Sequence, residues 1–400
     1  MGGSLLSFRL QKSMLQFDNM KKNIDHKNTP RISWVDTAKG IAIFTIVLGH
    51  TAGKGADSVL LRMCMFLGVS VFFFLSGMTF CWEQGTCPWF DHRPWQKFRR
   101  DLWKTLVRPY LMWATISVVI YSFLGKIAAG ILQSDRQHFT LWTNIVGMLY
   151  GNSGSGGSGG YMEWNRPLWF LTCLTMVKLI WYFLLGIKGK TGRVLRFLTM
   201  ILSAAWLVGA NLLGIHLHLP WELETAVSVL FCFGVGRYYR GISDNIGGID
   251  QVHWPANGCQ PLRRWIGTIC CIGCGIALFF LLLPEQTADF RADRFTHPWR
   301  IIPQVLLGLI FVIGISRQLQ QGHCWGNRIL NYLGRRSMSV LVLHKFMIVA
   351  CRILSVKIFI DENFVMLVIT DLCIAIITVI LCLMTEKVIS SLAPTLLGRE

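Results

Sequence analysis

The segment Trp34–His50 has the sequence WVDTAKGIAIFTIVLGH, an apolar stretch with two charged residues near its start and a histidine at its end. Its length and composition predict an α-helix buried in lipid or in a helix bundle. Lys39 and His50 are eleven residues apart. In an α-helix this spacing places both side chains on one face, about 16 Å apart along the axis. Asp36 lies one turn before Lys39, close enough to pair with it.

The charged groups of this helix have two interpretations. A charged side chain in a membrane span costs about 3 kcal/mol or more unless it faces a polar interior, so such residues are candidates for a functional site. On the face shared by Lys39 and His50, we expect Ile43, Ile46 and Val47 to wall a narrow passage. The alternative is a basic flank that anchors the helix, with one core histidine bonded to a backbone carbonyl.

The composition of the whole chain predicts a membrane protein. Of its 400 residues, 53% are hydrophobic and 15% are charged, whereas soluble domains carry about 25% charged residues. Apolar runs of about twenty residues recur along the whole length, and such a run can span a bilayer as a helix. We therefore predict an all-α, polytopic bundle of about ten transmembrane helices, at residues 35–53, 58–80, 103–125, 167–187, 194–214, 223–239, 265–283, 301–316, 337–358 and 364–388.

The distribution of lysine and arginine predicts the orientation of this bundle. Every second connection between the predicted spans is basic, and the others carry few cations or balance them with acids. By the positive-inside rule, both termini then lie in the cytoplasm of a multi-pass cell-membrane protein. Much of the net charge of +18 belongs to this bias, so we do not expect nucleic acid as a partner. The expected parts are a flexible tail at 1–30, a membrane domain at 31–390 and a C-terminal tail at 391–400.

Two of the predicted outer connections are large. The connection at 126–166 contains an amphipathic stretch, Leu141–Tyr150, and a run of Gly, Ser and Asn at 151–160. Such a run is typical of a flexible connector. The connection at 284–299 mixes acidic and basic residues, and it either borders an acceptor site or is a solvated loop.

A cationic stripe leads into the third predicted span. Lys97, Arg100, Lys104 and Arg108 recur at intervals of three and four residues, which places them on one helix face. Pro109 follows directly, and a kink or a helix start there would angle the stripe relative to the bundle. A cytoplasmic stripe suits a phosphorylated ligand, because arginine binds phosphate through its planar guanidinium group. Anchoring by positive charge explains the same residues.

Two further stretches carry candidate ligand contacts. Ser76-Gly77 lies near the end of the second span, where it allows close helix packing and offers a hydroxyl group. Glu163 and Asn165 precede Trp169 at the start of the fourth span. Sugar-binding surfaces use a carboxylate, an amide and a tryptophan ring in this way, and a tryptophan belt at the membrane interface is the alternative.

A second histidine, His344, lies about 12 Å inside the ninth span when counted from its basic start. His50 is expected at a comparable depth, and two imidazoles near the middle of the membrane suit proton transfer. A hydrogen-bonded structural histidine is the alternative for His344. The sequence has no Walker loop, no dinucleotide fingerprint and no Cys/His set with metal-ligand spacing, so we expect no metal.

Four stretches together resemble the membrane-bound acyltransferase family 3, and within it the fucose 4-O-acetylase-like branch. They occur in order over residues 31–390: Asp36–Gly40 with His50, Phe72–Gly77, Trp169–Leu171 after Asn165, and Leu333–Ser337 with His344. The family's hallmark is an arginine, ten residues and then a histidine, and Lys39 occupies the arginine position here. Lysine keeps the charge of arginine but not its bidentate fork.

The resemblance implies O-acyl transfer, usually of acetyl, from cytoplasmic acetyl-coenzyme A (acetyl-CoA) to a hydroxyl group of a carbohydrate. It makes His50 the essential histidine, Lys39 its cationic partner and Asp36 the accompanying acid. We expect His50 to act as the general base on the acceptor hydroxyl, and a transient acyl carrier is the alternative. We expect the cationic stripe and Ser76 to hold acetyl-CoA. We expect the acceptor to contact His344, Asn165, Trp169 and Glu163.

The expected partners are a carbohydrate acceptor, either lipid-linked or part of a surface glycan or exopolysaccharide, and the membrane lipids. The residues leave open a homo-oligomer or a glycan-assembly partner. A competing interpretation is a transporter of a small polar solute that uses His50, His344 and Asp371 as a proton relay. A third is a non-catalytic membrane subunit of a glycan-assembly complex.

Overall fold

The computed structural model describes residues 32–51, 59–80, 94–131, 141–151, 165–245, 261–285, 288–290, 294–321, 325–355 and 364–398. The chain divides into two units, Met1–Ile32 and Ser33–Glu400, and the second carries the helices described below. The predicted tail at 1–30 and all but the first residue of the run at 151–160 lie outside the described residues.

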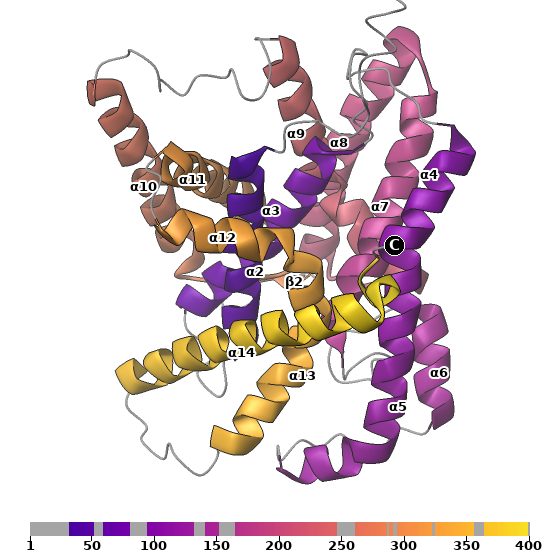
Figure 1. Cartoon of the computed structure of the whole chain (residues 1–400). Coiled ribbons are helices and arrows are strands. Elements are labelled where there is room, and N and C mark those ends of the chain that lie inside the picture. The colour runs from indigo at the N-terminus through magenta and orange to yellow at the C-terminus, as the bar shows by residue number, and fades with distance from the viewer. Residues whose placement is uncertain are drawn as a thin grey trace, which may run out of the picture. The chain divides into compact units, whose positions relative to one another are not determined.

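The described part of the chain is built almost entirely from helices, as the recurring apolar runs predict (Figure 1). These helices are α2 (Ser33–Thr51), α3 (Val59–Met78), α4 (Trp95–Leu102), α5 (Arg108–Ile131), α6 (Leu141–Tyr150), α7 (Trp169–Gly186), α8 (Gly189–Leu213), α9 (Leu223–Asn245), α10 (Pro261–Leu282), α11 (Ile301–Gln321), α12 (Trp325–Arg335), α13 (Ser337–Ser355) and α14 (Phe364–Leu392). A short antiparallel hairpin pairs β1 (Ala288–Asp289) with β2 (Arg294–Phe295).

Each of the ten predicted spans overlaps one helix, from α2 for the first span to α14 for the tenth. The amphipathic stretch at 141–150 is also helical, as α6. Within the described ranges, five stretches are long and apolar enough to cross a membrane by length and composition, namely Arg166–Gly186, Gly189–Leu213, Trp265–Leu282, Pro298–Gln320 and Val368–Leu392. The count of ten spans and the cytoplasmic position of both termini stay predictions.

The helix α12 lies where the sequence predicts only a basic connection. Its residues alternate with helical period, so that Leu333 and Gly334 are buried while Trp325 and Arg328 are exposed. The buried side packs along α2. A helix this short and this polar does not stand out as an apolar run, which is why hydropathy alone misses it.

Of the two alternatives expected at Pro109, a kink or a helix start, the structure excludes the helix start. The chain stays helical from α4 through a π-helical turn at Trp103–Val107 into α5. Pro109 has no N–H group to donate to the preceding turn, and the π-helical turn directly before it uses the wider i→i+5 hydrogen bonding. The π-helical turn therefore lets the helix continue from α4 into α5 without a break at Pro109.

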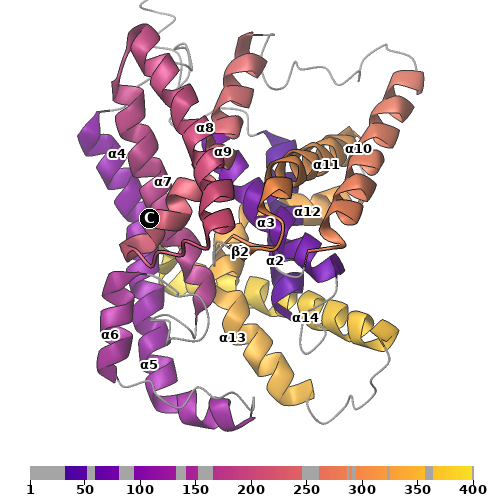
Figure 2. The ribbon, with the colours of Figure 1, turned by 180° about the vertical axis from the view of Figure 1, so that it is seen from behind.

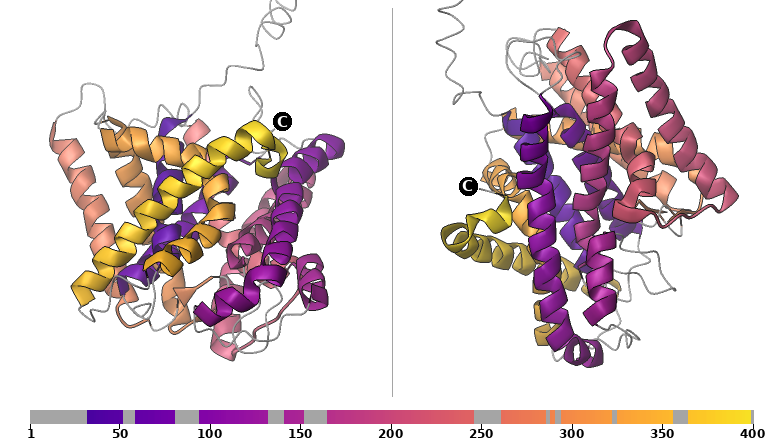
Figure 3. Two further views of the ribbon diagram at one scale, coloured as in Figure 1. Left: turned by 60° about the horizontal axis from the view of Figure 1, so that its bottom comes forward. Right: turned by 90° about the vertical axis from the view of Figure 1, so that its right-hand side faces the viewer.

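The helices α2 and α3 lie at the centre of the bundle. Figures 1 and 2 show α10 and α11 on one side of them and α4 to α8 on the other. The helix α14 packs on α13 and α2 and runs obliquely across them (Figure 3). This arrangement surrounds α2, the helix of the opening sequence segment, with protein on several sides.

Glycines allow the central helices to approach their neighbours closely. A Cβ atom on Gly40 of α2 would overlap the backbone of α12, and one on Gly334 of α12 would overlap the carbonyl group of Asp36. A Cβ atom on Gly77 of α3 would overlap the carbonyl group of Phe233 in α9. Small residues commonly serve this purpose between membrane helices, and the predicted packing role of Gly77 is confirmed.

Candidate active site

One face of α2 lines a cavity of about 170 Å³. The face carries Lys39, Ile46 and His50, which lie in one row at helical spacing. Ile43 and Val47, which the sequence also predicts on this wall, are instead packed within the protein and do not line the cavity. Pockets that enclose drug-sized ligands measure roughly 300–1,000 Å³, so this cavity suits a slender chain rather than a whole nucleotide.

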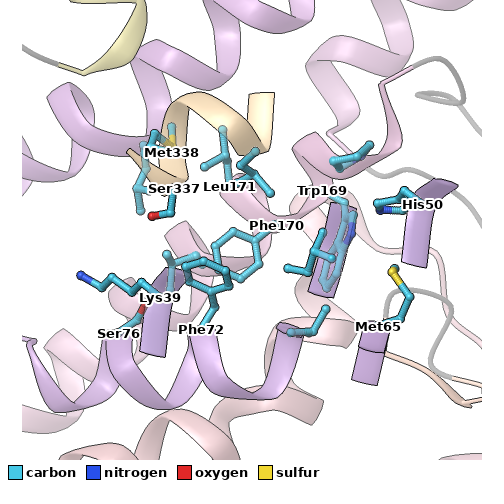
Figure 4. A pocket seen from close by; sticks show the side chains of 16 residues that line it. Lys39, His50, Met65, Phe72, Ser76, Trp169, Phe170, Leu171, Ser337 and Met338 are labelled. Carbon is cyan, nitrogen blue, oxygen red and sulfur yellow. The ribbon is translucent and has the colours of Figure 1, made fainter. Parts of the chain in front are cut away.

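The helix α3 lines the cavity alongside α2. Its lining residues are spaced by three and four, namely Met65, Val69, Phe72 and Ser76. The two helices run antiparallel, because Gly49 of α2 lies against Met65 while the earlier Ile46 lies against the later Gly68. Figure 4 shows the result: Ser76 lies beside Lys39 at one end of the cavity, and Met65 lies beside His50 at the other.

Four other elements complete the wall. Pro167 lies in the 3-10 turn Arg166–Leu168 that leads into α7, a position that suits the fixed backbone angle of proline. The remaining lining residues are Trp169, Phe170, Leu171 and Leu174 of α7, Leu106 of the π-helical turn, and Ser337, Met338 and Leu341 of α13.

The cavity has two chemically different ends. An ammonium group and serine hydroxyls lie at the Lys39 end, and an imidazole with the thioether of Met65 lies at the His50 end (Figure 4). Between them stand aromatic rings, with the centroids of Phe72 and Phe170 5.7 Å apart. The arrangement therefore suits a narrow ligand with a polar or anionic part near Lys39 and a reactive group near His50.

His344 lies next to His50. The centroids of the two imidazole rings are 5.2 Å apart, so the expected similar depth of the two histidines is confirmed. The His344 ring is fully buried, and its Nδ1 lies 2.9 Å from the carbonyl oxygen of Val340. Its Nε2 has no hydrogen-bond partner in the part of the chain that the structure describes. His344 contacts His50 without lining the cavity.

Asp36 makes a contact that the sequence does not predict. Its Oδ2 lies 3.2 Å from Nε of Arg335, the last residue of α12, and its carboxylate is buried. Thr37 donates a hydrogen bond of 2.8 Å to Asn327 of the same helix. Polar contacts thus fix the start of α2 against α12, close to Lys39. The predicted pairing of Asp36 with Lys39 stays a prediction.

The residues of the predicted cationic stripe are not part of the cavity wall. Lys97 and Arg100 are exposed and Lys104 and Arg108 are half-buried, and none of the four lines the cavity in the described ranges. The π-helical turn contains Lys104 and ends directly before Arg108. Nε and Nη2 of Arg108 are buried and have no hydrogen-bond partner among the described residues.

The residues expected to contact the acceptor do not all lie at the cavity. Trp169 lines the cavity. Asn165 is fully buried and its amide nitrogen donates to Ser117 Oγ at 3.1 Å, so it holds helices together and does not reach the cavity. Glu163 lies outside the described residues.

The connection at 284–299 is packed against the helices where it is described. Glu285 is buried, and its carboxylate accepts hydrogen bonds from the backbone N–H of His297 and from the amide of Gln304. Phe290, next to β1, packs on Phe66 of α3 with ring centroids 5.1 Å apart. A fully solvated loop is therefore excluded for these residues.

Two further observations concern other chemistries. Asp371 is buried, and its backbone oxygen accepts a hydrogen bond of 3.1 Å from Thr51, which follows His50. Among the described residues, no group of three or more His, Cys, Asp or Glu side chains lies close enough to hold a metal ion.

Several residues of the site are absent from the sequence-based hypothesis. Met65, Val69 and Phe170 line the cavity but look like ordinary apolar residues of a span, and Arg335 resembles other basic anchors. The signal that could have found Met65 and Val69 is their helical spacing from Phe72 and Ser76. The partner of Asp36 carries no such signal, because it depends on how α12 packs.

The chain was compared with known proteins. The acyltransferase domain of the acyltransferase 3 family matches residues 32–387. The chain belongs to this family. No curated protein and no solved structure gave a match. As an acyltransferase 3 protein the chain is a membrane acyltransferase, and the matched range contains every residue that lines the cavity. Family membership thus favours an enzyme over the transporter interpretation.

Proposed function

We propose that this acyltransferase 3 protein transfers an acetyl group from acetyl-CoA to a hydroxyl group of a carbohydrate, as a member of the fucose 4-O-acetylase-like branch. The observation that carries the proposal is the single cavity that joins Lys39 to His50 (Figure 4). Along α2 these residues are about 16 Å apart. A pantetheine arm is a slender chain with a thioester at one end and phosphate at the other, which is the kind of ligand that this cavity suits.

Positively charged side chains would bind the phosphate groups of acetyl-CoA. Lys39 lies at one end of the cavity, and two guanidinium nitrogens of Arg108 are buried without a hydrogen-bond partner among the described residues. Buried guanidinium nitrogens without a partner are unusual in native proteins and commonly indicate an unseen ion or ligand. Arginine is well suited to hold phosphate. Lys97, Arg100 and Lys104 would add an attractive field for an anionic donor around this region.

The chemistry of the transfer follows from the imidazole. In the proposed step, His50 takes the proton of the acceptor hydroxyl as its oxygen attacks the thioester carbonyl carbon. The new carbon–oxygen bond forms and the carbon–sulfur bond breaks, with its electron pair leaving on sulfur. The proton then passes from His50 to this thiolate, which yields the ester and free coenzyme A. General base catalysis of this kind contributes about 10²- to 10⁴-fold to the rate.

The acceptor side of the proposal rests on the wall around His50. Trp169 presents an indole ring to the cavity, and an aromatic ring provides an apolar face with a polar edge for ligand contact. We propose a carbohydrate acceptor that reaches His50 beside this ring. We further propose that the protein works in the cell membrane, where a lipid-linked sugar or a surface glycan is within reach.

The purified full-length chain in lipid nanodiscs provides the test. We expect it to bind labelled acetyl-CoA and to release free coenzyme A slowly, with water replacing the acceptor. His50→Ala should lower this release by about 10²- to 10⁴-fold while acetyl-CoA binding persists. His216→Ala is the control, because His216 is exposed in the connection between α8 and α9. A native chain that neither binds nor cleaves acetyl-CoA would exclude the proposal and favour a transporter or a non-catalytic subunit.

The acceptor is identified in a second experiment. Mass spectrometry of surface glycans from cells with the native chain, with His50→Ala or without the chain should show an acetyl ester that depends on His50. Identical glycan acetylation in all three would overturn the carbohydrate part of the proposal.

A further inference from the structure

The antiparallel pairing of α2 and α3 places Met65 at the same level of the cavity as His50. Along the cavity, Ser76 lies beside Lys39 and Met65 lies beside His50. Between these ends Ile46 lies against Gly68, which precedes the lining residue Val69. Figure 4 shows the side chain of Met65 directed toward His50 at the end remote from Lys39. Met65 therefore lies at the far end of the path that a ligand from the Lys39 side would follow.

The side chain of Met65 packs closely against α2. A Cβ atom on Gly49 would overlap both Cγ and Sδ of Met65, so the thioether lies directly on the glycine that precedes His50. Trp169, another large residue near this end, is held by rings on α3 and α7, with centroid distances of 6.4 Å to Phe73 and 6.1 Å to Phe170. The cavity wall beside His50 thus includes the indole of Trp169, packed against other aromatic rings, and the thioether of Met65, packed against α2.

We propose that Met65 determines the length of the acyl group that this site transfers and limits it to short chains. The inference rests on the proposed function, because it requires the thioester carbonyl beside His50. With the rest of the donor extending toward Lys39, the acyl chain lies between His50 and Met65 at the end of the cavity remote from Lys39. Each additional methylene group then meets the thioether of Met65.

The physical basis is steric discrimination in a narrow, mainly apolar pocket. One methylene group more or less in such a pocket changes the specificity about 10- to 200-fold. Truncation of Met65 to alanine removes its thioether and terminal methyl group and opens space next to His50. Gly49→Ala does the reverse, because the new Cβ atom displaces the thioether of Met65 from its place.

The experiment measures release of coenzyme A from acetyl-, butyryl- and hexanoyl-CoA by the purified full-length chain in nanodiscs. In this reaction water attacks the thioester, and the products are the free acid and coenzyme A. We expect Met65→Ala to raise the butyryl-to-acetyl ratio of kcat/KM by about tenfold or more. We expect Gly49→Ala to lower this ratio. Met63→Ala is the matched control, because Met63 lies on the same helix but does not line the cavity.

The outcomes separate this inference from the function on which it rests. A native chain that cleaves acetyl-CoA, with a butyryl-to-acetyl ratio that neither Met65→Ala nor Gly49→Ala changes, overturns the role of Met65 and leaves the proposed function intact. A folded native chain that cleaves none of the three donors overturns the proposed function and this inference with it. If Met65→Ala does not fold, Gly49→Ala decides alone. An unchanged butyryl-to-acetyl ratio of kcat/KM in Gly49→Ala then overturns the inference.

Discussion

The imidazole rings of His50 and His344 lie with their centroids 5.2 Å apart and their planes inclined by 31°. A carbonyl oxygen can only accept a hydrogen bond, so the 2.9 Å contact with Val340 assigns a proton to Nδ1 of His344. A neutral His344 then carries no proton on Nε2. The hydrogen bond to Val340 of the same helix therefore holds the ring of His344 in place, and this ring contacts the ring of His50.

We expect His344 to act as a positioning residue for His50. In His344→Asn the side-chain amide nitrogen can replace Nδ1 as the donor to Val340, while the rest of the ring is lost. Because misplacement of a catalytic group by about 1 Å can cost about 10²-fold, kcat for acetyl-CoA cleavage should fall about 10- to 100-fold with KM little changed. Steady-state kinetics measure both. An increase in KM at unchanged kcat would instead assign His344 to ligand binding.

The contact between Asp36 and Arg335 should stabilise the junction of α2 and α12. The side chain of Arg335 is 50% exposed and that of Asp36 is 4% exposed, so the buried carboxylate loses more when its partner is removed. We expect Arg335→Gln to lower the free energy of unfolding by about 1–3 kcal/mol. Arg328→Gln, an exposed arginine on the same helix, should have little effect.

A double-mutant cycle isolates the interaction itself. Asp36→Asn combined with Arg335→Gln should destabilise less than the sum of the two single substitutions, because residues in direct contact are not additive. Thermal unfolding in detergent measures the stability of the native chain, the two single variants and the double variant. Strict additivity would mean that the two side chains do not interact in solution.

The close approach of α2 and α12 gives a prediction about packing. Gly40→Ala places a Cβ atom where it overlaps the backbone of α12, and overpacking of this kind costs about 1–3 kcal/mol. Gly209→Ala in α8 is the control, because nothing lies within 4 Å of its added Cβ atom. We expect a lower Tm for Gly40→Ala, and an unchanged or higher Tm for Gly209→Ala since alanine favours helix. Equal Tm values for both variants would contradict the packing.

The sequence predicts which residues share a face of one helix, because helical periodicity alone decides this. The row from Lys39 to His50 follows from helical geometry alone, and the structure places both in one cavity. The span positions follow from hydropathy for the same local reason. A resemblance in short motifs over most of the chain also indicated the family, and the match over 32–387 confirms it.

What the sequence could not provide depends on contacts between distant segments. Arg335 is one of many arginines until α12 is placed along α2. Asn165 looks like a sugar-binding amide, and only the fold shows that it bonds to Ser117. Ile43 shares a helix with the site residues, but the position of the neighbouring helices directs it into the core. Periodicity describes one helix at a time, whereas a site is formed by several.

The four cations of the predicted stripe should differ in their effect on the donor. Arg108 has two buried nitrogens without a hydrogen-bond partner among the described residues, whereas Lys97 and Arg100 are exposed. We expect Arg108→Gln to weaken acetyl-CoA binding about tenfold, since a hydrogen bond to a charged group contributes about 1.5–3 kcal/mol. Exposed charges act at a distance and are screened by salt, so Lys97→Glu with Arg100→Glu should weaken binding mainly at low ionic strength.

A phosphate-free donor distinguishes this role from a structural one. Arg108→Gln should leave the cleavage of S-acetyl-N-acetylcysteamine unchanged, because this thioester has no phosphate for the guanidinium group to hold. Lys190→Gln, an exposed lysine at the start of α8, is the control for loss of one positive charge. An equal loss with both donors would show that Arg108 supports the fold of the cavity, since a phosphate contact affects acetyl-CoA alone.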